Sequence, residues 1–354
     1  MGHHPIHRGL LLGCLLLDNV GLGQAGDFDD AAMMHIEYPD WFKDSFLDLP
    51  EDIEEAREAG KEGLMILFTT QGCSYCAEFI RTSLSDPTLA ARLQAQFDAV
   101  GLEIFSDAEM TAPDGTHERV KAFAKRAGAE FSPTVKFVGT DGDLLYRGVG
   151  YHDPQRFGLV LDYLNEGKPE TQSFAEFVAA RSKGTAASDA SDRLVADALF
   201  SAPPYALDRS QSAADRPLLV IFETDGCRNC TRFHREVLAQ PEVRALLERF
   251  EIVRLDAEDN ETVLRKPDGE GATPADWWAA TGFSERPALL FFDEQGREVL
   301  GTDALVLRQR MLNSLHYVLE RAYDQDWTYQ RFARARSLER INEAREAGQL
   351  PSPE

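Results

Sequence analysis

Two short runs of apolar residues, 154 positions apart, organise the hydrophobic pattern of this chain. The runs 64–68 and 218–222 contain no polar residue and several branched ones, which is typical of a strand buried on both faces. Each run is followed by apolar residues at helical spacing, namely Phe79, Leu84, Leu89 and Leu93 in the first copy and Phe233, Leu238, Val243 and Leu247 in the second. The pattern predicts, twice, a buried strand that leads into an amphipathic helix.

The elements further along the chain are repeated in the same order. A second strand is expected at 98–105 and 251–257, and a helix follows a Pro-Asp-Gly turn in each copy. That helix carries Val120 and Phe123 in the first copy, and Trp277 and Trp278 as core or helix-packing residues in the second.

A predicted hairpin and a final helix complete the repeat. The segments 134–150 and 288–301 each read as two strands around an Asp-Gly or Gln-Gly turn. An amphipathic helix with Phe157, Val160, Leu161 and Leu164 follows the first hairpin. Strands that alternate with helices and end in a hairpin predict an α/β fold with a central mixed sheet flanked by helices.

The repeat spans a whole domain. The same offset of 154 positions separates Cys73 from Cys227 and Pro133 from Pro287, a period too long for a solenoid. Small and polar residues replace the apolar periodicity at 182–191, so we place the domain boundary at 185–190. The predicted parts are a signal peptide at 1–25, a first domain with a helical lead-in at 26–185, and a second domain with a C-terminal helical tail at 186–354.

The N-terminus has the order of a secretory signal peptide. A weakly basic start ends at Arg8, and the apolar stretch 10–17 that follows is too short to span a membrane. We expect cleavage after Ala25 and export. A lipid anchor on Cys14 is a lesser alternative because the apolar run continues past it, and Asp18 leaves a cytoplasmic start open. No later segment reaches the roughly 18 apolar residues of a membrane helix, so no stable membrane insertion is expected.

The chain of 354 residues is strongly acidic. It has 60 Asp and Glu against 37 Lys and Arg, a net charge of -23, which argues against binding to nucleic acid or anionic membranes.

Four of the five cysteines form two C-x-x-C pairs. A disulfide that closes two intervening residues stabilises little, so a structural role is not expected. A cysteine at the start of a helix has a lowered thiol pKa because its thiolate faces unpaired N–H groups, and a second cysteine one turn later can resolve a mixed disulfide. Zinc binding is the alternative, but neither copy has a second Cys or His pair at zinc-finger spacing. The spacing favours redox chemistry.

The chain resembles the thioredoxin superfamily, and more closely the periplasmic thioredoxins associated with bacterial sulfur oxidation. The resemblance rests on the motifs GCSYC, SLSDPTLAARL, SDAEMTAPDG and SPT, on the lead-in from YPDWF to EAGK, and on the tails TQSFAEFVAARS and WTYQRFARARS. It covers residues 38–183 and, more loosely, 192–346. In this family a cis proline faces the cysteine pair and helps to hold the substrate peptide, although a proline at the start of a strand is also common for purely structural reasons.

The resemblance assigns roles to residues of both copies. The predicted catalytic residues are Cys73 and Cys227 as nucleophiles with Cys76 and Cys230 as resolving thiols, and the predicted substrate-binding residues are Pro133, Pro287, Ser132 and Arg286. We expect Arg286, together with Arg228 of the second motif, to stabilise the thiolate of Cys227. His234, four residues after Cys230, either tunes that thiol or is an ordinary solvent-facing or capping residue, and the second role is favoured.

Two departures from classical thioredoxins stand out. Glycines, Gly72 and Gly226, precede the first cysteines where thioredoxins have Trp, and Leu67 and Ile221 replace the buried acidic residue that aids proton transfer. These changes affect the expected redox potential and proton route.

The sequence therefore predicts a periplasmic thiol-disulfide oxidoreductase that acts on protein cysteines, as a reductase. No cofactor beyond the redox-active disulfides is expected. The expected partners are proteins with thiols or disulfides and a membrane thiol-electron donor, without nucleic acid. The alternatives are a disulfide oxidase or isomerase, a catalytic domain joined to a non-catalytic docking domain, here the second copy, and a metal-binding protein.

Overall fold

The computed structural model describes residues 28–129, 131–182 and 197–348. We call residues 28–182 domain 1 and residues 197–348 domain 2. The predicted leader with its cleavage site and Cys14, and the domain boundary at 185–190, lie outside the described residues. Within these ranges no helix combines the length and the apolar character that crossing a membrane requires.

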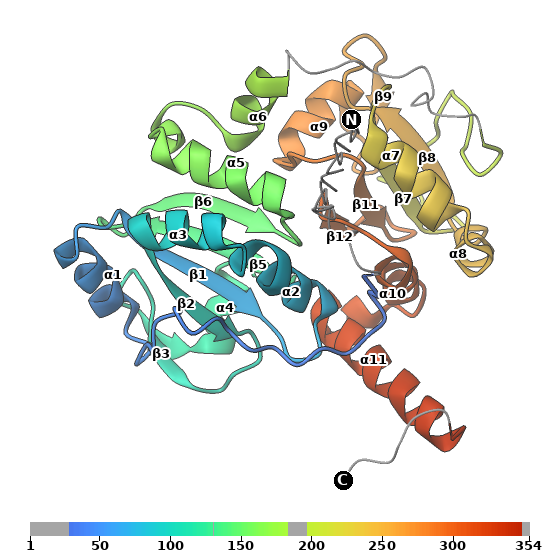
Figure 1. Cartoon of the computed structure of the whole chain (residues 1–354). Coiled ribbons are helices and arrows are strands. Elements are labelled where there is room, and N and C mark those ends of the chain that lie inside the picture. The colour runs from blue at the N-terminus through green and yellow to red at the C-terminus, as the bar shows by residue number, and fades with distance from the viewer. Residues whose placement is uncertain (1–27, 130, 183–196, 349–354) are drawn as a thin grey trace, which may run out of the picture.

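Domain 1 is built around a four-stranded mixed sheet in the order β2-β1-β5-β6 (Figure 1). Strand β1 runs parallel to β2 and antiparallel to β5, and β5 and β6 form the predicted hairpin. The elements are α1 (Leu49–Glu58), β1 (Gly63–Thr69), α2 (Ser74–Phe79), the π-helical turn η1 (Ile80–Leu84), α3 (Pro87–Gln96), β2 (Phe97–Glu103), β3 (Glu109–Thr111), β4 (His117–Arg119), α4 (Val120–Arg126), β5 (Thr134–Gly139), β6 (Leu144–Val149), α5 (Pro154–Asn165), η2 (Lys168–Glu170) and α6 (Phe174–Ser182).

Domain 2 repeats this architecture with the sheet order β12-β11-β7-β8. Its elements are β7 (Leu218–Glu223), α7 (Arg228–Phe233), the π-helical turn η4 (His234–Leu238), α8 (Pro241–Leu247), β8 (Glu251–Asp256), β9 (Leu264–Arg265), β10 (Gly271–Ala272), α9 (Pro274–Thr281), β11 (Ala288–Phe292), β12 (Glu298–Thr302), α10 (Arg308–Leu319), η5 (Ala322–Gln325) and α11 (Tyr329–Glu346). The expectation of two α/β domains, each with a mixed sheet flanked by helices, is confirmed.

The central strands are buried along their whole length. Every residue of β1 and of β7 is buried, as the uninterrupted apolar runs predict. Alternate side chains of each strand pack into two separate apolar clusters, one on each face of the sheet. The C-terminal end of each central strand therefore has a fixed position in the sheet, and the cysteine motif follows directly after it.

The helix expected after each cysteine motif is interrupted. In domain 1 the α-helix passes through the π-helical turn η1, ends at Ser85 and begins again at Pro87. The carboxylate of Asp86 accepts hydrogen bonds from the N–H groups of Thr88 and Leu89, and a proline suits the first helical position because it has no N–H group to satisfy there. The apolar spacing predicted one helix because it continues across this break.

Short hairpins flank the Pro-Asp-Gly turns. Strands β3 and β4 pair in domain 1, and β9 and β10 pair in domain 2. With two or three residues each, these strands are too short to show an alternating pattern in the sequence. Of the two tryptophans, Trp277 is buried against Phe222, as expected for a core residue, and Trp278 is partly buried.

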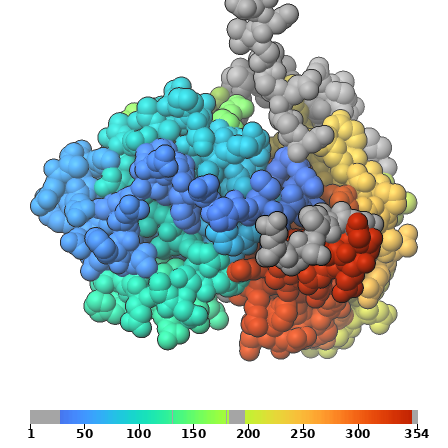
Figure 2. Space-filling view, turned by 60° about the horizontal axis from the view of Figure 1, so that its bottom comes forward, coloured from blue at the N-terminus to red at the C-terminus, as the bar shows by residue number. Residues whose placement is uncertain are grey.

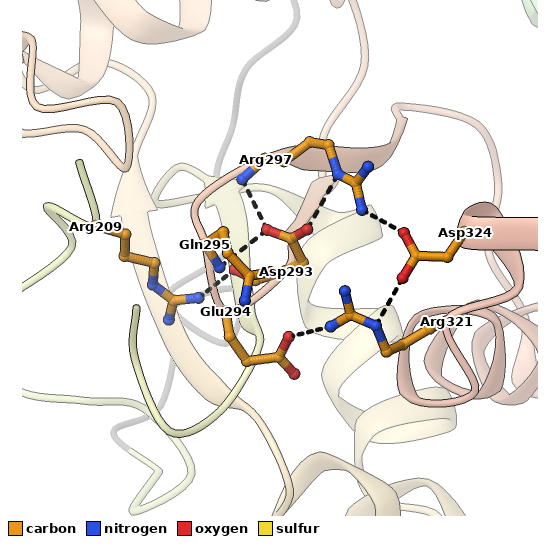
Figure 3. Close-up of polar contacts among 7 residues, drawn as sticks. All are labelled: Arg209, Asp293, Glu294, Gln295, Arg297, Arg321 and Asp324. Carbon is orange, nitrogen blue, oxygen red and sulfur yellow. Dashed lines mark hydrogen bonds and ion pairs between the residues drawn. The ribbon is translucent and has the colours of Figure 1, made fainter. Parts of the chain in front are cut away.

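A polar network fixes the hairpin turn of domain 2 to η5, the short helix that follows α10 (Figure 3). The buried carboxylate of Asp293 accepts hydrogen bonds from the backbone N–H groups of Gln295 and Arg297 and from the Arg297 guanidinium. Asp324 bridges Arg297 and Arg321. The hairpin turn is therefore held to η5, which lies between α10 and α11.

His152 is buried in domain 1 in its neutral form. Its Nδ1 donates to the carbonyl oxygen of Gly150 (2.9 Å) and its Nε2 accepts from the Tyr146 hydroxyl (2.9 Å). Burial, and secondly the cation of Arg156, lower the pKa of His152 from 6.5 to about 3. The unfolded chain takes up a proton below its ordinary pKa and the folded chain does not, so this histidine stabilises the fold above that pKa and destabilises it progressively as the pH falls from 6.5 towards 3.

We expect His152→Gln, which can keep both hydrogen bonds but cannot titrate, to flatten the acid side of the stability profile. The free energy of unfolding of the wild type should fall faster with decreasing pH, by up to about 1.4 kcal/mol per pH unit more than that of the variant. Urea denaturation at several pH values between about 7 and 4 measures the difference. Parallel profiles would show that His152 does not titrate differently on unfolding.

Candidate redox sites

Each C-x-x-C pair lies at the point where a central strand leads into a helix. Cys73 is the N-cap of α2, and its Sγ accepts a hydrogen bond from the N–H group of Cys76 (3.1 Å). Cys227 caps α7 and accepts from Cys230 at the same distance. Both pairs are disulfide-bonded, with Cα–Cα distances of 5.3 and 5.2 Å. The sulfur of each first cysteine therefore lies among the unpaired N–H groups of a helix N-terminus, where a thiolate is stabilised.

The glycines before the motifs are required by the backbone. Gly72 and Gly226 have φ angles of +88° and +75°, in the left-handed region that residues with a Cβ rarely adopt. A side chain at Gly72 would also meet the Met33 side chain. The absence of the tryptophan found in classical thioredoxins therefore has a local cause.

Both prolines lie beside the cysteine pairs. The peptide bonds Ser132–Pro133 and Arg286–Pro287 are cis. Because Thr134 pairs with Phe68 across β1 and β5, Pro133 lies at the sheet edge where the first cysteine motif begins. In domain 2 the Sγ of Cys227 is 3.8 Å from the carbonyl oxygen of Arg286. The structure thus places four of the eight residues singled out in the sequence at each site, namely the two cysteines, the cis proline and the residue before that proline. Their roles stay predictions.

The two sites differ in exposure. In domain 1 all four residues from Cys73 to Cys76 are buried, with exposed fractions of 8%, 6%, 4% and 0%. In domain 2 Cys230 is buried and Cys227 is partly exposed, and Arg228 and Asn229 between them are exposed. The duplicated motif is therefore closed in one copy and open in the other.

The lead-in of the chain covers the first site from one side. Gln71 exchanges two hydrogen bonds with the backbone of Ile36, and the N–H group of Gly72 donates to the carbonyl oxygen of Met34 (3.0 Å). Tyr75, between the two cysteines, donates its hydroxyl proton to the carboxylate of Asp30 (2.9 Å). Burial raises the pKa of the Tyr75 phenol well above its ordinary value, so it stays a proton donor.

Domain 2 covers the first site from the other side. The guanidinium of Arg310 lies 3.3 Å from the centre of the Tyr75 ring and donates to the carbonyl oxygen of Ser132 (3.0 Å). The side-chain oxygen of Gln330 accepts from the N–H group of Ser132 (3.2 Å). Figure 2 shows the blue lead-in crossing domain 1 towards the red C-terminal helix.

A cleft between the domains reaches Asn229, the residue next to Cys230, although neither cysteine of the second site lines it. The cleft has a volume of about 400 Å³ and is lined by Asn229, Arg286 and Pro287 of domain 2 and by Tyr151 and Arg156 of domain 1, among others. Both domains therefore form the walls of the cleft beside the second disulfide.

The side chain of Arg286 does not have the contact expected of it. Its guanidinium stacks on Trp278, 5.0 Å from the ring centre, and pairs with Glu258 at 3.5 Å. Arg286 contacts Cys227 through its carbonyl oxygen.

A buried carboxylate beside the second site was missed in the sequence. Glu223, the last residue of β7, is fully buried and both its oxygens lie within 3.0 Å of Nε2 of His234. Its position on β7 is two residues after Ile221, and so on the same face of the strand, under α7. His234 is the C-cap residue of α7, in line with the capping role favoured by the sequence, and its partly buried side chain also contacts Glu223. In domain 1 the equivalent positions hold Thr69 and Ile80. The acidic residue of domain 2 could be found in the sequence only by searching two positions beyond the place where thioredoxins have it.

Within residues 28–129, 131–182 and 197–348, no three His, Cys, Asp or Glu side chains are grouped so that they could hold a metal ion.

The comparisons with known proteins agree with this architecture. The model of the thioredoxin-like domain family matches residues 49–165 and again residues 204–319. Similar solved structures include a thioredoxin-fold protein from Helicobacter pylori, with 21% identity over 41% of this chain and 88% of that chain and a TM-score of 0.32. A thioredoxin from Thermus thermophilus has 23% identity over 34% and 86%, with a TM-score of 0.27.

A third similar structure is the C-terminal domain of DsbD from Neisseria meningitidis, with 19% identity over 29% of this chain and 82% of that chain and a TM-score of 0.22. No curated protein matches the sequence. The two family matches cover most of the chain and include both cysteine pairs and the two cis prolines Pro133 and Pro287. The chain thus belongs to the thioredoxin-like domain family and contains two copies of its domain.

Proposed function

We propose that this protein is a periplasmic thiol-disulfide oxidoreductase that reduces disulfides in other proteins through its C-x-x-C pairs. The observation that carries the proposal is the position of each disulfide, at the N-terminus of a helix and beside a cis proline. A disulfide of this kind closes only two residues and constrains little, whereas its sulfur lies where a thiolate is stabilised.

The reaction starts from the reduced pair and depends on the short distance between its two cysteines. The thiolate of Cys227 attacks one sulfur of a substrate disulfide, forms a mixed disulfide, and releases the other substrate sulfur as a thiolate. Cys230, whose Cα is 5.2 Å away, then attacks Cys227 and releases the second substrate thiol. The protein loses two electrons and the substrate gains them. The same steps apply to Cys73 and Cys76 wherever a substrate reaches them.

The resemblance to sulfur-oxidation thioredoxins supports the remaining parts of the proposal. A periplasmic reductase needs a source of electrons, because the periplasm has no glutathione buffer that would supply them. A membrane thiol transporter is the proposed donor, and a sulfur-oxidation or cytochrome-maturation protein is the proposed recipient. The reaction needs no cofactor besides the disulfides themselves. An oxidase or isomerase would use the same sulfur atoms with electron flow in another direction.

We expect Cys73→Ser combined with Cys227→Ser to abolish insulin reduction in a dithiothreitol-coupled assay. Serine cannot form the mixed disulfide, so the rate should fall on the order of a hundred-fold or more, to the dithiothreitol background. Thr70→Ser combined with Thr224→Ser, in the loops just before the two motifs, is the matched control and should keep the rate. Insulin reduction by the cysteine variant at the wild-type rate would rule out the assigned nucleophiles.

The exposure of the two sites favours a second candidate, in which only one domain is catalytic. The sequence suggested that the second copy was the docking domain. The closed first motif favours the opposite arrangement, with the second copy as the catalytic one.

A further inference from the structure

We propose that the face formed by the starts of α10 and α11 occupies the first redox site as a built-in substrate mimic, so that other proteins react first at the second site. This inference rests on the proposed function and specifies where that function takes place. It concerns a contact between the two domains of one chain.

The mimicry is carried by the backbone of Ser132. An extended peptide binds through backbone N–H and C=O groups that are not already paired within a sheet, and Ser132 lies just before β5, outside the sheet ladder. Both groups of Ser132, the residue before the cis proline, are already bonded by domain 2. The side-chain amide oxygen of Gln330 accepts from the N–H group, and the guanidinium of Arg310 donates to the C=O group. An incoming strand would have to displace both side chains.

The two mimicking side chains are themselves buried in the contact. Arg310 is 5% exposed and Gln330 is 8% exposed. The guanidinium of Arg310 lies over the rings of both Tyr75 and Phe131, at 3.3 and 4.6 Å from their centres. Tyr329, next to Gln330, stacks on Phe131 with the ring centres 5.2 Å apart. The contact is therefore a packed interface around the cysteine motif.

A cap that crosses between the domains fixes the start of α10 in this position. The carboxylate of Asp30, in the lead-in of domain 1, accepts hydrogen bonds from the N–H groups of Gln309 (3.2 Å) and Arg310 (2.9 Å). The N–H group of Leu307 donates to the Tyr75 hydroxyl (3.0 Å). These bonds satisfy N–H groups that a helix start otherwise leaves unpaired, so α10 is held against the motif.

The space that remains at each site agrees with this assignment. The cavity beside Cys73 has a volume of about 50 Å³, which admits water and excludes a peptide. A larger pocket of about 500 Å³ lies beside Ser74, but neither Cys73 nor Pro133 lines it. The cleft beside Asn229 and Pro287 has about 400 Å³, within the range of ordinary ligand pockets. A substrate strand therefore has room beside the cis proline of the second site in the arrangement seen here, whereas at the first site Gln330 and Arg310 already bind the backbone of Ser132.

The test compares the reduction rates of the two disulfides in the full oxidised chain. Dithiothreitol gives two electrons and two protons to a protein disulfide and becomes a cyclic disulfide itself. After timed pulses the new thiols are alkylated, and peptide mass spectrometry gives the rate for each site. In the variant Arg310→Ala/Gln330→Ala, dithiothreitol should reduce the first disulfide at least about ten-fold faster than in the wild type. A ten-fold change in rate corresponds to about 1.4 kcal/mol, the order of one buried hydrogen bond. The second disulfide of the variant should keep the wild-type rate.

Arg308→Ala combined with Arg331→Ala is the matched control. These residues lie on the same two helices and contact Glu242 and Trp327 within domain 2. This control should leave both rates unchanged. The unchanged rate of the second disulfide also serves as the check that the variant is folded, and Gln330→Ala alone, with a smaller increase, provides a milder variant.

Three other outcomes would overturn the inference. They are a first-site rate that does not change in a folded Arg310→Ala/Gln330→Ala variant, an equal increase at both sites, and an equal increase in the control. None of these affects the proposed function, which fails separately if neither disulfide exchanges with thiols.

Discussion

Replacing Cys227 with serine is expected to remove most of the insulin reductase activity of the full chain, and replacing Cys73 with serine is expected to leave most of it. Cys227 is partly exposed and Asn229 of its motif lines a cleft, whereas Cys73 is buried under α10 and the lead-in. The loss of an accessible nucleophile lowers turnover on the order of a hundred-fold or more. Initial rates of insulin reduction by the two single variants measure the difference.

The same measurement can be made on a variant in which the contact of domain 2 with the first site is removed. Cys227→Ser combined with Arg310→Ala/Gln330→Ala should regain activity, because the first disulfide is then accessible. Cys227→Ser with Arg308→Ala/Arg331→Ala should stay inactive. Equal losses in Cys73→Ser and Cys227→Ser would instead mean that insulin uses both sites, or that electrons pass through both on the way to it.

The sequence predicts the core of each domain well because short stretches of the sequence are enough to identify the core strands. The runs around Ile66 and Val220 are apolar at every position, and a strand buried on both faces is the structure that such a run favours. The break between η1 and α3 was not predicted, although Asp86 and Pro87 signal a helix start, because the apolar spacing continues across it. The short hairpins were missed because two or three residues carry no readable alternation.

The positions of the cysteines and prolines were also predictable, since each follows or precedes a central strand. The closure of the first site was not. Tyr75 and Asn229 occupy the same place in the two motifs, and nothing in their neighbours in the sequence distinguishes a buried residue from an exposed one. The contacts that bury Tyr75 come from Leu307 and Arg310, more than 200 positions away. A pattern within one domain contains no information on such contacts.

The largest expected effect on stability concerns this pair of equivalent residues. Tyr75→Ala removes a ring that packs against Arg310 and Phe28, together with a hydroxyl that joins Asp30 to Leu307. We expect the free energy of unfolding to fall by about 3 kcal/mol or more, the usual cost of truncating a buried aromatic residue. Asn229→Ala, at the exposed position, should change it by less than about 0.5 kcal/mol. Urea denaturation followed by circular dichroism measures both.

Tyr75→Phe separates the ring from the hydroxyl. The variant keeps the surface on which Arg310 lies and loses the bonds to Asp30 and Leu307, so its loss should be about 1 to 2 kcal/mol, the cost of unmade buried hydrogen bonds. If Tyr75→Ala were no more harmful than Asn229→Ala, the packing of domain 2 on the first motif would contribute nothing to stability. A loss confined to Tyr75→Ala and Tyr75→Phe would show that one copy of a duplicated redox motif has become part of a domain interface. That arrangement explains why Cys73 is buried while Cys227, its counterpart in the other copy, is partly exposed.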